Sequence, residues 1–516
     1  MKKLMLLLAV GSLFATGLYA QQVLGVCGNS TEDQRLYEHR LLANIETANA
    51  GGVTDRGAVQ YVPVYFHLVG DANGEGKVKE RLVLDQLCAL NEAFSTADIR
   101  FYLRAHPTQN TIFNYSINAT NVYSNQDSWF TMQSNRHPNA LNVYIVDEAV
   151  SSNNSPGITL AYYNIPRDWV VSRKDQISGA SSNSTLPHEV GHFFSLAHTF
   201  LGWESNPFDS TDPTWPIAPS ISPGGVPTER MSGSNCSTAA DKICDTPPDY
   251  NFGLFDNDDC NYDGGAKDPS NVDVVPMENN MMSYFNNCSA YVFTTQQKNV
   301  MVADLNSSAR NYLDNNYTPP ALEINTPTNL LVSPAAGATV PYYDEVLVEW
   351  QDLPEATWYL LEFDLVSTYA TPFAQSFMVN TNSKLVTTLL PNRTYYWRVR
   401  PINEYVTCAA VRQRTLKTTG TSAVRDIEGL TAWQIAPNPV RNGENANLFV
   451  QAEEAFDANI RVFTTTGQEI LNRSNVHFQN GDNRIELPVT DLRNGLYMVM
   501  LQTREGQAVR KLSVLK

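Results

Sequence analysis

One short segment constrains this chain of 516 residues more than any other: His188-Glu189-Val190-Gly191-His192-Phe193-Phe194-Ser195-Leu196-Ala197-His198. Residues at positions i and i+4 lie on the same face of a helix, so His188 and His192 can reach one ion. His198 stands six positions after His192 and can join them only if the helix ends in between. The segment therefore predicts a short helix, a sharp turn and a metal centre of three histidines.

The residue types in this segment predict hydrolytic chemistry. Three neutral imidazoles leave the fourth position of a tetrahedral zinc ion open for water, whose pKa falls to about 7. We expect Zn²⁺ bound by His188, His192 and His198, with Glu189 as the catalytic base that activates the zinc-bound water for attack on a peptide bond. The alternative is a chance match on a solvated helix, and the third histidine argues against it.

The amino terminus and the charge of the chain predict an exported protein. Lys2 and Lys3 precede the apolar run Leu4–Phe14, which is typical of a signal peptide over residues 1–20. No later run reaches the roughly 18 apolar residues that a transmembrane helix needs. The net charge of −17 argues against a nucleic-acid partner, which would favour a basic face.

Seven cysteines are an odd number, so at least one thiol has no partner within the chain. Four of them fall in one loop-rich stretch and predict two disulfides, whose pairing the spacing leaves open: Cys236, Cys244, Cys260 and Cys288. Cys88 stands in a helical pattern and Cys408 in a strand-like run. We expect these two to be buried side chains without a further role.

The first half of the chain predicts a propeptide followed by an α+β domain. Residues 21–56 are polar, contain one helix-like segment at Thr31–Ala50, and have too little apolar surface to fold alone. Residues 57–318 alternate strand and helix patterns and then continue into a long irregular stretch, as a catalytic domain with loops would. The patterns are strands at Val62–Val69, Ile99–Leu103 and Leu141–Val146 and helices at Lys79–Phe94 and Leu186–Phe200.

The second half of the chain predicts two all-β domains, both expected to be β-sandwiches. Residues 321–418 alternate at period two, with strands expected at Val346–Trp350, Tyr359–Phe363 and Tyr395–Arg400. Leu389, Pro391, Tyr395 and Val399 have the spacing of a tyrosine corner, and this segment resembles fibronectin type III domains, which serve as spacers or adhesive modules. Residues 432–516 form the last all-β stretch.

The segment from Tyr61 to Asp314 resembles the pappalysin-type metallopeptidases, a family of the metzincin clan. The zinc motif carries the resemblance together with Asn280-Met281-Met282-Ser283-Tyr284, which matches the methionine turn. Supporting matches are Phe66-His67, Leu90-Asn91-Glu92-Ala93-Phe94, Asp245-Thr246-Pro247 and Phe293-Thr294-Thr295-Gln296-Gln297. The resemblance implies a metzincin-type fold in which Met282 forms the floor beneath the zinc and Tyr284 stabilises the tetrahedral intermediate.

The chain departs from this family at two places. Ser195 stands where the family has glycine, which makes the backbone turn after the helix less favourable. Family members that cleave beside basic residues have an acidic residue soon after the tyrosine, whereas this chain has Asn286 and Asn287. A strong preference for arginine is therefore not expected.

The same resemblance implies a calcium site and a latency device. Asp241 and Thr246 match positions that hold Ca²⁺ in bacterial relatives. Nearby acids either add calcium ligands or form a solvated loop: Asp256, Asp258, Asp259 and Asp263. In some relatives a propeptide cysteine blocks the zinc, so Cys27 is the expected switch, with activation by cleavage near Arg56.

The last segment resembles the carboxy-terminal sorting domain of the type IX secretion system. The matching residues are Ala436-Pro437-Asn438-Pro439, Thr466-Gly467-Gln468, Asn494-Gly495-Leu496-Tyr497 and Arg510-Lys511-Leu512. The resemblance implies a Bacteroidetes-type bacterium, the secretion machinery as a partner, and a protein that is secreted or held on the cell surface.

These patterns together predict a secreted zinc endopeptidase, made as a latent zymogen, that acts as a monomer on extracellular proteins or peptides. Two alternatives stay open. One is a surface adhesin with a degenerate metallopeptidase domain, which Ser195 favours and Glu189 opposes, because a purely structural zinc does not need this glutamate. The other is a zinc hydrolase with a non-peptide substrate.

Overall fold

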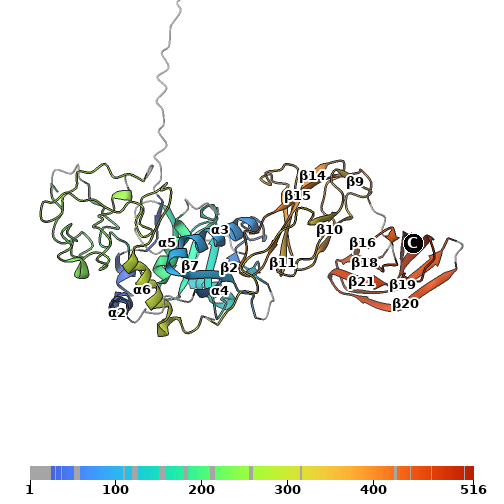
Figure 1. The fold of residues 1–516 in the computed structure, drawn as a ribbon, viewed down its shortest axis with the longest axis horizontal. Helices are drawn as coiled ribbons and strands as arrows, with labels where there is room; N and C mark the ends of the chain where they lie inside the picture. The colour runs from blue at the N-terminus through green and yellow to red at the C-terminus, as the bar shows by residue number, and fades with distance from the viewer. Residues whose placement is uncertain are drawn as a thin grey trace, which may run out of the picture.

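The computed structural model describes most of the chain and shows three bodies in a row (Figure 1). The described residues are 25–29, 31–36, 38–51, 59–107, 111–118, 126–149, 158–178, 184–209, 216–254, 260–313, 316–422, 427–441, 443–465, 468–504 and 506–515. The expected signal peptide, Arg56, Asp256, Asp258, Asp259, Thr466 and Gly467 lie outside them. Within these ranges, no helix combines the length and apolar character that a bilayer span requires.

The first body is built on a seven-stranded sheet with the order β1-β6-β7-β5-β2-β3, and β4 also pairs with β2. Its strands are Gly25–Cys27 (β1), Gln60–Leu68 (β2), Ile99–Leu103 (β3), Phe113–Asn114 (β4), Leu141–Val146 (β5), Ile158–Asn164 (β6) and Trp169–Arg173 (β7). Strands β6 and β7 pair antiparallel, whereas β2 pairs parallel with β3 and β5. Strand β5 is buried at every position, as a parallel strand covered on both faces must be.

Helices of the first body pack their apolar faces into one core with the sheet. They are Thr31–Arg35 (α1), Glu38–Asn49 (α2), Glu80–Ala93 (α3), Gln126–Asn135 (α4), Thr185–Phe193 (α5) and Thr295–Leu305 (α6), with short 3₁₀ turns at Ser95–Ala97, Lys174–Gln176, Cys236–Thr238, Phe252–Leu254 and Ser308–Arg310. Helix α3 buries Val83, Leu87 and Leu90 at helical spacing against the core that α5 also joins. Helix α2 lies beside α6 (Figure 1).

The helix expected over Leu186–Phe200 is shorter than the periodicity predicts. Helix α5 ends at Phe193 because Ser195 takes a left-handed backbone conformation, with φ of 67°. The apolar residues Leu196 and Phe200 stay buried, but in a loop. The break between His192 and His198 that the metal motif requires is therefore confirmed, and only the apolar periodicity continues past the end of the helix.

The second body is a two-sheet β-sandwich. A three-stranded sheet has the order β13-β10-β8 and a five-stranded sheet the order β12-β11-β14-β15-β9. The strands are Leu331–Ser333 (β8), Ala338–Val340 (β9), Val346–Trp350 (β10), Trp358–Asp364 (β11), Gln375–Val379 (β12), Ser383–Val386 (β13), Thr394–Ile402 (β14) and Arg412–Thr418 (β15). The Tyr395 hydroxyl accepts a hydrogen bond of 2.9 Å from the Leu390 amide, which is the bond that the tyrosine-corner spacing predicts.

The third body is also a two-sheet sandwich, with the orders β16-β18-β21 and β17-β23-β22-β19-β20. Its strands are Leu430–Ala436 (β16), Val440–Arg441 (β17), Ala446–Ala452 (β18), Phe456–Thr464 (β19), Glu469–Phe478 (β20), Gly481–Leu487 (β21), Gly495–Gln502 (β22) and Gln507–Leu515 (β23). Trp433, Ile460 and Leu512 lie in its core. The α+β body and the two β-sandwiches fit the multidomain fold that the sequence predicts.

The expectation that Cys88 and Cys408 have no further role is wrong. They form a disulfide, with Cα atoms 6.3 Å apart, that joins helix α3 to the loop after β14 in the sandwich. Beside it, Arg400 pairs with Asp85 at 2.5 Å, and Thr407 donates to the Leu84 carbonyl. The two cysteines are 320 positions apart in the sequence and belong to different domains, so spacing gave no indication of the pair.

Candidate metal centre

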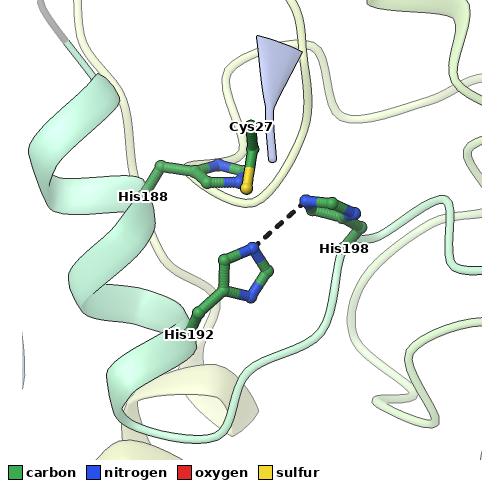
Figure 2. A group of neighbouring side chains, drawn as sticks. All are labelled: Cys27, His188, His192 and His198. Carbon is green, nitrogen blue, oxygen red and sulfur yellow. Dashed lines mark hydrogen bonds between the residues drawn. The ribbon is translucent and has the colours of Figure 1, made fainter. Parts of the chain in front are cut away.

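Three buried imidazoles converge on one point beside helix α5. His188 and His192 lie one turn apart on this helix, and His198 approaches from the loop that follows (Figure 2). His192 Nε2 is 3.1 Å from His198 Nε2. With the Cys27 thiol, the possible ligand atoms of the three histidines all lie within 4.8 Å of one another. The structure thus brings together the three histidines and the cysteine that the sequence singles out.

Ser195 makes the turn that brings His198 back to the helix. Its amide donates to the His192 carbonyl at 2.9 Å, and the Leu196 amide donates to Gly191 at 3.1 Å. A left-handed conformation costs a residue with a side chain roughly 1–2 kcal/mol. Asn44 of helix α2 donates a hydrogen bond to Ser195 Oγ at 2.8 Å, so the serine hydroxyl has a buried partner.

Each imidazole is oriented through its Nδ1 atom. The Met281 carbonyl lies 2.8 Å from His188 Nδ1, and the Leu196 carbonyl lies 2.8 Å from His192 Nδ1. His198 Nδ1 instead faces Glu204 Oε1 at 3.2 Å. When Nδ1 donates to such an acceptor, Nε2 keeps its lone pair and can bind a metal.

Burial keeps the three imidazoles neutral. It lowers the pKa of His188 to about 4 and the pKa values of His192 and His198 well below their ordinary value. His188 Nε2 and Glu189 Oε2 are buried and have no hydrogen-bond partner among the described residues. Lone pairs on neutral nitrogens beside an unpaired carboxylate oxygen fit a zinc ion with a water molecule, so the residues present match the metal that the sequence predicts.

Glu189 and Tyr284 border the same space. Burial raises the pKa of Glu189 to about 8, although a hydrogen bond with the Cys27 thiol opposes the shift. The Tyr284 hydroxyl donates to the Cys27 carbonyl at 3.2 Å, and the ring stands 5.2 Å from the His198 ring. Burial also raises the pKa of the Tyr284 phenol well above its ordinary value, so this hydroxyl keeps its proton.

Met282 lies directly against helix α5. A Cβ atom at Gly191 would collide with Met282 Sδ, so the absence of a side chain at Gly191 permits this approach. The Thr199 amide donates to the Met282 carbonyl at 3.3 Å, which joins the segment after His198 to the methionine turn. Met282 therefore supports the helix that carries two of the histidines.

Asp249 is a buried residue of this site that the sequence did not single out. Its Oδ2 accepts hydrogen bonds from Thr199 at 2.9 Å and from Ser283 at 2.6 Å. These two residues are the neighbours of His198 and Tyr284, so one carboxylate holds both segments together. The sequence did not single out Glu204 either, because a lone acidic residue after a histidine motif carries no recognisable signal.

A small cavity lies beside Glu189, and its lining includes residues that follow the methionine turn. It is lined by Cys27, Leu160, Ser184, Thr185, His188, Glu189, Ser283, Tyr284, Phe285 and Asn286. Among these lining residues Glu189 is the single carboxylate, and Asn286 offers a neutral amide. Asn287 lies next to it with a positive φ of 57°.

Residues 25–29, 31–36 and 38–51 lie on this site. Strand β1 pairs parallel with β6, which brings Cys27 to the histidines, and burial raises the pKa of the Cys27 thiol well above its ordinary value. Helix α2 continues the contact: Arg40 donates to the Phe193 carbonyl at 3.0 Å and pairs with Asp304 at 3.0 Å. We call residues 25–51 the pro-segment, because they follow the expected signal peptide and cover the histidines.

Asp241 and Thr246 meet in the loop-rich lobe. Thr246 Oγ1 donates to both carboxylate oxygens of Asp241 at 3.1 Å, and both residues are buried. Burial raises the pKa of Asp241 to about 8 and that of the neighbouring Glu229 to about 9. Glu229 Oε2 has no hydrogen-bond partner among the described residues, while Asp263 is exposed.

The four cysteines of the loop-rich lobe form two disulfides. Cys236 bonds to Cys244, and Cys260 bonds to Cys288. Cys288 lies four positions after Tyr284, so the second disulfide fastens the segment that borders the cavity. Cys27 is the one free cysteine, and it is buried.

Comparisons with known proteins give sequence and structural relatives. Residues 434–515 match the family model of a secretion system C-terminal sorting domain. An extracellular metalloprotease of Neurospora crassa is 26% identical over 258 residues, which cover 45% of this chain and 81% of the fungal protein. One from Colletotrichum graminicola is 30% identical over 195 residues, 34% of this chain and 66% of the relative. A solved promirolysin mutant of Tannerella forsythia is 18% identical, with a TM-score of 0.37, and covers 56% of this chain and 96% of that one.

Proposed function

We propose that this chain, a secreted or cell-surface metalloprotease with a carboxy-terminal sorting domain, hydrolyses peptide bonds of extracellular proteins with zinc bound by His188, His192 and His198. One observation carries the proposal: three buried, neutral imidazoles converge beside the unpaired carboxylate oxygen of Glu189. The fungal relatives support a peptide substrate over a non-peptide one. An adhesin would need neither Glu189 nor Tyr284 at this place.

The geometry supports a hydrolytic mechanism. Zinc bound by the three histidines would supply a Lewis acid that polarises a water molecule and the scissile carbonyl. Glu189 takes the proton of the attacking water and passes it to the leaving amine. Burial raises the pKa of Glu189 to about 8, and the positive charge of a bound zinc ion would lower it again and favour the ionised carboxylate that accepts this proton. Tyr284 keeps its proton and donates a hydrogen bond to the oxyanion of the tetrahedral intermediate.

The pro-segment supports a latent zymogen, with Cys27 as the switch. The Cys27 sulfur lies among the histidines, where its thiolate would occupy the metal position that water needs (Figure 2). The Asn29 amide donates to this sulfur at 3.4 Å and partly opposes the rise in the thiol pKa that burial causes, and the charge of a bound zinc ion would favour the thiolate further. Cleavage near Arg56 would release residues 21–56 and free the catalytic domain from about Gly57.

Asp241 and Thr246 support a structural calcium site, which also includes Glu229. Asp241 and Glu229 are buried, their raised pKa values favour the protonated forms at neutral pH, and Glu229 Oε2 has no hydrogen-bond partner among the described residues. A divalent cation that replaces these protons would therefore stabilise the fold. Ca²⁺ added to protein stripped of calcium should therefore raise its melting temperature. An E229Q variant should lose most of this increase.

The first test compares the activated chain with its E189A variant. We expect both to bind one zinc, because Glu189 is not a ligand. Cleavage of a protein substrate should fall by about 10²–10⁴-fold in E189A, the range that a general base supplies. If the unaltered chain binds zinc fully but does not cleave the substrate, the adhesin function is favoured. If E189A cleaves the substrate as fast as the unaltered chain, another catalytic mechanism is favoured.

Latency has its own test. A C27A zymogen should cleave substrate before any processing, whereas the unaltered zymogen should not. If the C27A zymogen is as inactive as the unaltered zymogen, Cys27 is not the latency switch.

A further inference from the structure

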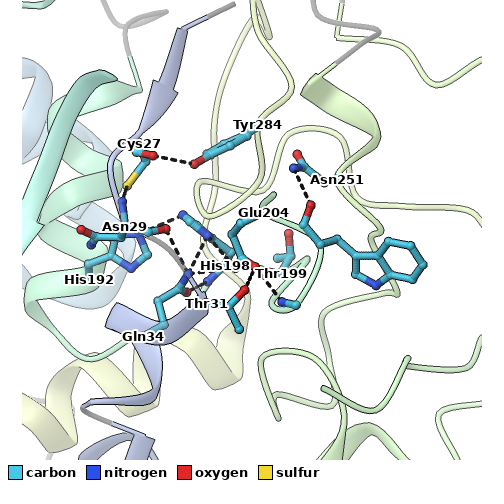
Figure 3. Close-up of polar contacts among 12 residues, drawn as sticks. Cys27, Asn29, Thr31, Gln34, His192, His198, Thr199, Glu204, Asn251 and Tyr284 are labelled. Atoms are coloured by element: carbon cyan, nitrogen blue, oxygen red, sulfur yellow. Dashed lines mark hydrogen bonds and ion pairs between the residues drawn. The ribbon is translucent and has the colours of Figure 1, made fainter. Parts of the chain in front are cut away.

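A carboxylate lies behind the third histidine of the metal centre. Glu204 is buried, and its Oε1 stands 3.2 Å from His198 Nδ1. The other oxygen, Oε2, accepts the Gly202 amide at 2.8 Å, which fixes the carboxylate in place. Figure 3 shows Glu204 beside His198. Glu204 cannot bind the ion itself, because the imidazole ring stands between the carboxylate and the converging Nε2 atoms.

His198 is the ligand that most needs such a partner. His188 and His192 are held by helix α5, and each faces a neutral peptide carbonyl through Nδ1. His198 lies on a loop beyond the strained turn at Ser195, so no helix fixes its ring. A carboxylate on Nδ1 fixes the tautomer that leaves Nε2 free and makes Nε2 a stronger donor to the metal.

The pro-segment makes contact with this same carboxylate. Gln34 Nε2 lies 2.9 Å from Glu204 Oε1 and 2.8 Å from His198 Nδ1, while Gln34 Oε1 accepts the His198 amide at 2.8 Å. The Thr31 hydroxyl donates to Glu204 Oε2. Gln34 therefore competes with His198 for Oε1, and it could donate to Nδ1 itself, which would favour the tautomer with a proton on Nε2.

We propose that Glu204 is a positioning residue for His198, and that Gln34 and Thr31 of the pro-segment occupy this carboxylate until the pro-segment leaves. After its departure, Glu204 has His198 Nδ1 and the Gly202 amide as partners. This inference rests on the proposed function, because it assumes a metal at the three histidines. It adds a second contact between pro-segment and metal centre, separate from Cys27.

The test measures zinc affinity by competition with a chelator, together with the visible spectrum of the Co²⁺-substituted protein, on the activated chain for Glu204 variants and on the full chain for Gln34 variants. E204Q keeps the shape of the side chain and removes its charge. We expect it to weaken zinc binding by about 10- to 100-fold, as loss of a partner behind a metal ligand does, and to shift the Co²⁺ bands. D268N is the matched control, since Asp268 is equally buried but bonds to the amides of Ser270 and Val272.

Q34A supplies an independent arm that does not depend on how E204Q folds. Removal of the competing amide should leave zinc affinity equal to that of the unaltered chain or tighter. Weaker binding in Q34A would assign the positioning role to Gln34 and overturn the proposal. Zinc affinity in E204Q within twofold of the control would overturn it as well.

Melting temperatures separate a metal role from a structural one. A merely structural Glu204 would lower the melting temperature of zinc-free and zinc-loaded E204Q equally. Our proposal predicts a smaller gain on zinc addition, because stabilisation by a ligand follows its affinity. If the unaltered chain does not bind zinc, the proposed function is wrong. This outcome differs from a failure of the Glu204 proposal, in which the unaltered chain binds zinc normally.

Discussion

Asn44 Nδ2 lies 2.8 Å from Ser195 Oγ, which joins the pro-segment to the turn between the second and third histidines. The same nitrogen donates to Asp304 Oδ1 at 2.9 Å, and Asp304 also pairs with the buried Arg310 at 2.7 Å. Ser195 stands at a position that favours glycine, and its hydroxyl has a hydrogen-bond partner, Asn44, in the pro-segment. Serine in place of glycine at position 195 therefore provides a contact for the pro-segment and does not require a degenerate metal site.

An N44A variant should loosen the pro-segment. It loses two hydrogen bonds, each contributing about 1 kcal/mol, and leaves the Ser195 hydroxyl buried without this donor. We expect limited proteolysis to remove the pro-segment several-fold faster than in the unaltered chain. T47A, on the exposed face of the same helix, is the control and should be processed at the ordinary rate. Equal rates for N44A and the unaltered chain would contradict the docking role.

The disulfide between Cys88 and Cys408 should stabilise the catalytic domain more than the one between Cys236 and Cys244. The first spans 320 residues and the second eight, and in the chain-entropy model this difference is worth about 3 kcal/mol. The paired serine variants C88S/C408S and C236S/C244S, unfolded by denaturant without reductant, test this order. A larger loss in C236S/C244S would show that local strain or loop structure outweighs loop length.

His67 should make the protein less stable in acid. Its pKa is lowered to about 3, mainly by burial and to a smaller extent by the nearby His137 and His106, while a hydrogen bond with Asn142 opposes the shift. The unfolded pKa is about 6.5, so the unfolded chain binds a proton that the folded chain rejects. Stability from His67 is therefore complete above pH 6.5 and falls as pH decreases, by about 1.4 kcal/mol per unit, until the folded pKa is reached.

The variant H67Q isolates this contribution from that of the metal-binding histidines. Its free energy of unfolding, measured between pH 5 and pH 7, should change less steeply with pH than that of the unaltered protein. Parallel curves would show that another group controls the acid response.

Local chemistry allowed the sequence to predict much of the fold and the core of the site. Strand Val346–Trp350 coincides with β10, and strand Leu141–Val146 with β5, because apolar and alternating patterns report burial directly. The metal motif predicted three histidines on a helix and a turn, because spacing on a helix fixes which side chains meet. The end of α5 at Phe193 escaped periodicity, since backbone conformation at Ser195 decides it.

The contacts that required the three-dimensional fold could not be predicted. Glu204, Asp249 and Gln34 are ordinary polar residues in the sequence, and only the path of the chain brings them to His198 and Tyr284. The Cys88–Cys408 pair depends on how two domains meet, which no local pattern records. Long-range partners of buried polar groups are therefore the part of such a site that sequence reasoning misses.

The cavity beside Glu189 predicts cleavage next to uncharged residues. Asn286 borders this cavity with a neutral amide, and a buried arginine side chain needs a carboxylate partner other than the catalytic base. We expect the activated enzyme to cleave a peptide library with no enrichment of arginine at the cleaved bond. In N286D, an added carboxylate should raise kcat/KM for arginine-containing peptides by about tenfold relative to the leucine analogue, the effect of about 1.4 kcal/mol of new pairing. S234A, a change in an exposed loop residue that does not line the cavity, controls for general effects of substitution. Strong arginine preference in the unaltered enzyme would show that another carboxylate reaches the substrate, and an N286D variant without any shift would place the substrate side chain away from Asn286.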